Sequence, residues 1–91
     1  MRTFKQATAD HLAALGKLGW AVKAGLKIPH ATSPDGKVRL WFKPQAVWAS
    51  PGERGSDMGA ARSCHVDMRT ATTAELIADG EYFAACERAG R

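Results

Sequence analysis

KVRLWFKPQAVWA, residues 37–49, is the stretch that decides the fold. It contains two of the three tryptophans, a phenylalanine and three basic residues. Aromatic, β-branched and long side chains at this density are typical of a β-strand, so the stretch predicts a strand around which the rest of the chain packs. Just before it, SPDG at 33–36 has the residue order of a type I turn and predicts a hairpin.

Alternation along this strand assigns its side chains to two faces. The set expected to face the core is Val38, Leu40 and Phe42. The set expected on the outer face is Arg39, Trp41 and Lys43. Pro44 cannot donate to a ladder of hydrogen bonds, so a bulge or strand end is expected there, and the facing of Val47 and Trp48 stays open.

Upstream, the sequence predicts a helix followed by a strand. Thr8 can cap a short helix that ends near residue 18. From residue 20 the apolar spacing alternates, which predicts a strand over 20–28 with Lys23 and Lys27 on its polar face. A helix that continues to Ala24 remains an alternative.

Downstream, the sequence predicts a loop, a third strand and a second helix. Glycines, a proline and charged residues at 50–59 indicate a mobile loop, and alternation resumes over 62–69 as a strand. Thr72 and Glu75 have the spacing of a capping box, so the last helix is expected to begin at Thr73.

The expected order is α-β-β-β-α in a single domain, residues 1–91. Both helices have one apolar stripe and each strand has one apolar face. The fold class is therefore α+β, a three-stranded antiparallel sheet with two helices on one face and the other face open. This order resembles that of double-stranded RNA binding domains over most of the chain, although the last helix starts with Thr73-Ala74-Glu75 where those domains place lysines.

The net charge of +4 is unevenly distributed. Residues 1–49 carry eight Lys or Arg against two Asp, giving +6, whereas residues 50–91 carry five Arg against seven acids, giving −2. The basic half predicts an anionic partner. With Trp41 as an exposed anchor, the expected contact residues are Lys23, Lys27, Arg39, Trp41, Lys43, Arg54 and Arg69.

The sequence contains little evidence for a catalytic nucleophile or for a metal site. Cys64 and His65 are neighbours in a predicted strand and point to opposite faces, so they cannot form a nucleophile and base pair. His65 and Asp67 share a face without a nucleophile and are expected to be a polar surface pair. His30 and Cys86 complete no ligand spacing with them. We therefore expect no enzyme, no metal and no cofactor.

Composition indicates a cytoplasmic protein that does not enter membranes. The two cysteines lack C-x-x-C spacing, and no apolar run reaches the length of a signal peptide or membrane span. In its small size, single α/β unit and lack of a catalytic motif, the chain resembles accessory proteins of phages and mobile elements, among them anti-CRISPR proteins. That resemblance implies occupation of a surface on a nucleoprotein machine.

The expected function is therefore a non-enzymatic binding protein. Its partner would be a protein or nucleoprotein complex, and an inhibitor of the anti-CRISPR type is one form that such a protein takes. The alternative is a nucleic-acid-binding module that uses the same basic, aromatic sheet face.

Overall fold

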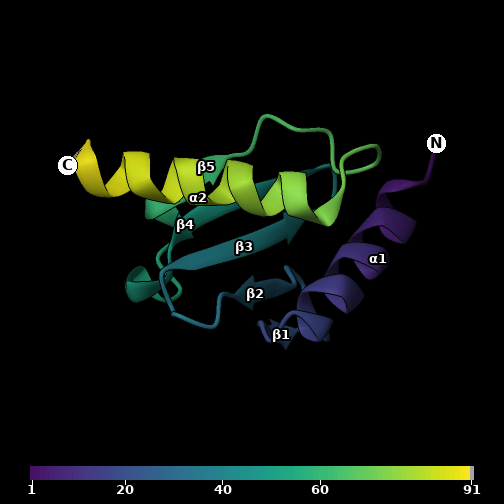
Figure 1. Ribbon diagram of the computed structural model, residues 1–91, viewed down its shortest axis with the longest axis horizontal. Coiled ribbons are helices and arrows are strands. Elements are labelled where there is room, and N and C mark those ends of the chain that lie inside the picture. The colour runs from purple at the N-terminus through teal and green to yellow at the C-terminus, as the bar shows by residue number, and fades with distance from the viewer. Residues whose placement is uncertain (91) are drawn as a thin grey trace.

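The computed structural model describes residues 1–90 and shows two helices against one antiparallel sheet (Figure 1). The helices are α1 (Phe4–Lys17) and α2 (Thr73–Ala89). The strands are β1 (Ala21–Lys23), β2 (His30–Thr32), β3 (Val38–Lys43), β4 (Ala46–Pro51) and β5 (Arg62–Ser63). The class α+β with two helices holds, but the expected three-stranded sheet is wrong. The sheet has five strands in the order β1-β2-β3-β4-β5.

The single strand expected over residues 20–28 is in fact two short strands. β1 ends at Lys23, and the chain returns after an unpaired connection as β2, with Val22 opposite Ala31 in an antiparallel ladder. Gly25 and Pro29 lie in the connection and both disfavour a continuous strand, because glycine is conformationally free and proline lacks an N–H.

The alternative of a helix running to Ala24 is also wrong. Helix α1 ends at Lys17, and Gly19 adopts a left-handed backbone conformation with φ of 88°. That conformation suits the residue just beyond a helix end and turns the chain into β1.

The predicted central stretch forms a hairpin of two strands. Pro44 and Gln45 connect β3 to β4, and Lys43 lies opposite Ala46. Pro44 therefore ends the strand, one of the two outcomes expected. β4 continues to Pro51, so the expected loop at 50–59 begins later than predicted, and it contains two 3-10 turns, η1 (Gly52–Arg54) and η2 (Met58–Ala60).

The third expected strand, 62–69, is wrong beyond Ser63. Arg62 and Ser63 form the short strand β5 beside β4, and the Cys64 N–H makes one more bond to the Val47 carbonyl at 2.8 Å. The Asp79 carboxylate on α2 then accepts the backbone N–H groups of His65 and Val66, at 2.7 and 3.2 Å. These two bonds direct the chain away from the sheet and toward α2.

Both helices begin at capping boxes. The box formed by Thr72 and Glu75 is present, and the predicted start of α2 at Thr73 is confirmed. Helix α1 begins more than one turn earlier than predicted, because Thr3 accepts the Gln6 N–H at 3.1 Å and the Gln6 side chain accepts the Thr3 N–H in return.

The two helices pack on the same face of the sheet. In Figure 1 α2 crosses in front of the strands, and α1 lies beside them, near β1 and β2. α2 approaches closely through Gly80, where a Cβ atom would lie 2.5 Å from Leu40 Cδ2. α1 packs against the same face through His11, whose ring centre lies 6.5 Å from that of Phe42. Leu40 and Phe42 thus face the core, as predicted, and the opposite side of the sheet is called here the helix-free face.

Candidate functional site

The helix-free face is built from side chains that alternate with the core residues. Strand register places them in rows across the sheet, since directly opposite residues point to the same side. The central row is Lys23, His30, Trp41, Trp48 and Ser63. The row beside it is Ala21, Thr32, Arg39 and Ser50, and Lys43 pairs with Ala46 at the other flank.

The charges on this face are all positive. Within residues 1–90 the five strands contain no Asp or Glu, while Lys23, Arg39 and Lys43 belong to the face. None of these three cations takes part in any of the ion pairs found in the described part of the chain. Those pairs are Arg2–Asp10, Arg54–Asp57, Arg62–Glu87, Arg69–Asp67 and Arg88–Glu53. The face therefore carries uncompensated positive charge.

Trp41 lies on this face but is not exposed, contrary to expectation. Only 5% of its surface is accessible, and its Nε1 donates a hydrogen bond to Ser50 Oγ at 2.9 Å. Its ring centre lies 4.9 Å from that of His30 and 5.3 Å from Arg39 Cζ. Because β3 is the middle strand of five, side chains from β2 and β4 and from its own strand surround the indole. Trp41 is thus packed among the other side chains of the face and does not project from it.

The aromatic ring that stays partly accessible is Trp48. It lies directly opposite Trp41 on β4 and is half-buried. The ammonium nitrogen of Lys43 lies 3.9 Å from its ring centre, the geometry of a cation–π contact. Sequence reasoning left the facing of Trp48 open. If Pro44-Gln45 is read as a two-residue hairpin loop, the register follows and places Trp48 on this face.

His30 is a second residue of the face that sequence reasoning did not include. Its pKa is lowered from 6.5, first by burial and then by the positive charges of Arg39 and Lys23. Among the described residues its Nδ1 is buried and has no hydrogen-bond partner. A lowered pKa keeps the ring neutral at pH 7, so the charge of the face comes from lysine and arginine.

Three of the predicted contact residues lie elsewhere. Lys27 is in the connection between β1 and β2, beside α1. Arg54 is in η1 and pairs with Asp57 at 3.6 Å. Arg69 follows β5 in a loop, pairs with Asp67 at 2.9 Å and lies over the Phe4 ring.

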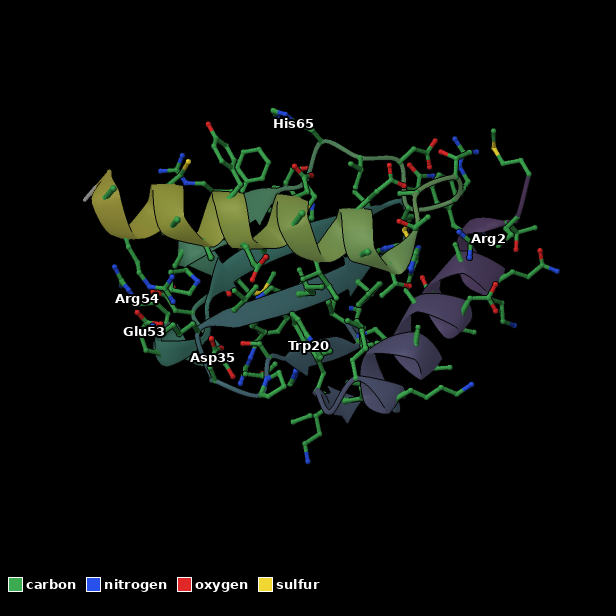
Figure 2. All side chains as sticks on the ribbon, in the orientation of Figure 1. Arg2, Trp20, Asp35, Glu53, Arg54 and His65 are labelled. Atoms are coloured by element: carbon green, nitrogen blue, oxygen red, sulfur yellow. The ribbon has the colours of Figure 1, made fainter. Side chains whose placement is uncertain are left out.

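Arg54 and Arg69 are also far from each other. Figure 2 shows Arg54 beside Glu53 at one end of the molecule and Arg2 at the opposite end. Arg2 in turn donates to the backbone oxygen of Arg69, which fixes Arg69 at that second end. Of the seven predicted residues, the structure brings together Lys23, Arg39, Trp41 and Lys43.

The residues considered for catalysis are separated by the fold. Burial, and to a lesser degree the charge of Asp79, raises the pKa of the Cys64 thiol to about 12, so it remains protonated at neutral pH. Asp67 bonds with Arg69, and His65 packs its ring against Phe83 at 4.7 Å, so the expected His65 and Asp67 pair does not form. Within residues 1–90 no group of three or more His, Cys, Asp or Glu could hold a metal ion.

A search of residues 1–90 for a helix of sufficient length and hydropathy to cross a membrane finds none. Comparisons of the chain with protein families, with curated proteins and with solved structures give no match.

Proposed function

We propose that this chain is a non-enzymatic binding protein that docks its helix-free face on the nucleic-acid part of a nucleoprotein complex. The observation that carries the proposal is the uncompensated charge of Lys23, Arg39 and Lys43 on strands that contain no acid within residues 1–90. Cations without carboxylate partners on a flat sheet suit the phosphates of a nucleic-acid backbone.

The arrangement lets the three cations reach different phosphates. Lys23 and Arg39 are two strand spacings apart across the sheet and two residues apart along it, which is about 12 Å between their Cα atoms. Arg39 is oriented by the bond that its Nε donates to Thr32 Oγ1 at 3.0 Å, which leaves its terminal nitrogens for a ligand.

Lys43 and Trp48 form a replaceable contact. The Lys43 ammonium lies over the Trp48 ring, and moving it onto a phosphate would uncover that ring. A base from a single strand could then stack on the exposed indole, an interaction that tolerates any base sequence. The face thus supplies backbone contact with little sequence preference.

A second candidate is an acidic protein surface, favoured by the partly accessible Trp48 next to Arg39 and Lys43, since tryptophan and arginine are frequent anchors at protein interfaces. An inhibitor that occupies a nucleoprotein machine, as the resemblance to anti-CRISPR proteins implies, could use either contact.

The test is binding of labelled single-stranded and duplex oligonucleotides as salt is raised from about 50 to about 200 mM. Three phosphate contacts predict a slope of log affinity against log salt of about −2 to −3, and each of Lys23→Gln, Arg39→Gln and Lys43→Gln should reduce its magnitude by about one. Lys17→Gln, at the far end of α1, is the matched control and should leave the slope unchanged.

Absence of binding at the lowest salt would overturn the nucleic-acid proposal. Recovery of a nuclease-resistant protein complex from cells, lost with Arg39→Ala and kept with the control, would favour the acidic protein surface. Equal loss in the control would show that total charge, rather than this face, determines binding.

A further inference from the structure

A second surface, which meets the helix-free face at Lys43, runs along the outer side of α1. It is a groove between α1 and the connection at residues 24–29. Two adjoining hollows of about 480 and about 400 Å³ form it and share Lys5, Thr8 and Pro29. The first is lined by Leu12 and Val22 among others, and the second by apolar rings that include Phe42.

The groove combines an apolar lining with a cation on each wall. Lys5 belongs to α1 and Lys27 to the opposite wall, the connection at residues 24–29. A third cation, Lys43 of β3, lines the second hollow where the groove meets the helix-free face. No Asp or Glu among residues 1–90 lines either hollow, and neither Lys5 nor Lys27 makes an ion pair there. Leu26, in the same connection, is 52% exposed, so this wall presents an apolar side chain to solvent.

We propose that this groove binds an acidic amphipathic helix of a partner protein. The lining follows α1 from Phe4 to Ala13, which at 1.5 Å per residue is about 13 Å, or two and a half helical turns. A helix of that length presents one apolar stripe with polar residues on both sides. Its stripe lies on the accessible apolar residues of the lining, which include Ala9, Val22 and Pro29, and glutamates on its two flanks meet Lys5 and Lys27.

The positions of the two lysines favour a helix over a smaller amphiphile. A fatty acid has an apolar chain and one carboxylate, so it could neutralise one wall and would leave the other lysine unpaired. A helix with acidic residues on both flanks pairs with Lys5 and Lys27 at the same time. The complementarity of charge and apolar surface therefore indicates a peptide ligand.

The probe is a synthetic peptide of about 15 residues with leucines at helical i, i+3, i+4, i+7 spacing and glutamates on both flanks. Its matched partner has the same leucines and lysine flanks. Binding is measured by fluorescence anisotropy, and the contact is mapped by backbone amide shifts. We expect the acidic peptide to bind and to shift residues 4–13 and 22–29.

Charge reversal on the two walls gives the sharpest comparison. Lys5→Glu with Lys27→Glu should weaken binding of the acidic peptide about tenfold and reverse the preference toward the basic peptide, because two attractions become repulsions. Lys17→Glu with Lys37→Glu changes the net charge equally, outside the groove, and should leave binding near the wild-type value. Circular dichroism checks that both variants fold.

Lys23→Glu separates this groove from the helix-free face. It should weaken nucleic-acid binding and leave the acidic peptide unaffected. The groove proposal is overturned if the acidic peptide does not bind, if amide shifts map to the helix-free face, or if both double variants lose binding equally. Full displacement of the peptide by dodecanoate, with shifts at the same residues, would overturn it in favour of a small anionic amphiphile.

Discussion

At the residue scale, the helix-free face depends on a buried polar contact. Trp41 on β3 and Ser50 on β4 are diagonal neighbours across the strand pair, and both side chains are almost fully buried. The indole N–H donates to the serine hydroxyl at 2.9 Å, so each residue satisfies the other in a place that water scarcely reaches. The part of the sheet that carries the cations of the face is therefore held in place by a satisfied, buried hydrogen bond.

Removing both partners of that contact should cost less than the sum of the two single removals. Ser50→Ala leaves the Trp41 N–H without its acceptor, and we expect a loss of about 1 to 3 kcal/mol in the free energy of unfolding. Trp41→Phe combined with Ser50→Ala should cost less than the two single changes added together. Urea unfolding measures these differences, with Ser56→Ala in the exposed loop as control. Strict additivity would contradict the contact.

The ion pairs of Arg54 and Arg69 are predictable from the sequence. Each has an acid within three positions, Asp57 and Asp67, and pairs with it in the structure. Such local acids were a signal that these arginines are already neutralised. Burial of Trp41 had no comparable local signal, since it depends on neighbours from two other strands.

A pH effect follows from the contact between η1 and α2. The hydrogen bonds that Arg88 donates to Glu53 lower the pKa of that carboxyl from 4.5 to about 2. The folded state therefore holds fewer protons than the unfolded state between these values. The stabilisation is fully present above pH 4.5 and is lost as pH falls toward 2.

Glu53→Gln tests this linkage. The difference in unfolding free energy between wild type and variant should be largest near neutral pH and should narrow as pH falls from 4.5 toward 2. Ser56→Ala, an exposed change that removes no titratable group, should not show the same narrowing. A difference that stays constant through this range would exclude the contact as a source of pH dependence.

At the element scale, the packing of α2 on the sheet depends on a glycine. Gly80 is in the helix interior, where alanine is normally preferred by up to about 1 kcal/mol. A Cβ atom there would lie 2.5 Å from Leu40 Cδ2 in the buried core. Close approach therefore outweighs helix propensity at this position.

Gly80→Ala should consequently destabilise the protein, by about 1 to 3 kcal/mol. Leu40→Val removes the atom that clashes, so the double variant should recover part of the cost of Gly80→Ala measured against Leu40→Val alone. Thermal or urea unfolding provides the comparison, and Ala85→Gly on the exposed side of α2 reports propensity alone. A stabilised Gly80→Ala variant would contradict the close packing.

Secondary structure was predictable where a local motif determines it. The capping box of Thr72 and Glu75 predicts the start of α2 correctly, and the equivalent spacing of Thr3 and Gln6 is the better signal for α1 than Thr8. The division of this region into β1 and β2 was harder to predict. Residues 20–28 keep an alternating apolar pattern, which favours one strand, although Gly25 and Pro29 interrupt pairing. The departure after Ser63 depends on Asp79, which is distant in the sequence and could not be anticipated.

At the scale of the whole molecule, the basic first half of the chain serves two surfaces. Lys23 and Arg39 belong to the helix-free face, whereas Lys5 and Lys27 border the groove beside α1, and Lys43 lies where the two surfaces meet. Charge counted along the sequence predicted an anionic partner but could not divide the cations between two sites. That division needs the fold, since Lys23 and Lys27 are four residues apart and lie on different surfaces.

The outermost strands have a consequence for solubility during binding. β1 contains three residues and β5 two, so each edge of the sheet offers only a few unpaired backbone groups. A strand of another copy would therefore form few backbone hydrogen bonds at either edge. Very short edge strands are one way in which natural sheets avoid edge-to-edge aggregation. The molecule can thus present an uncovered β-surface to a partner without adding its own copies to the sheet.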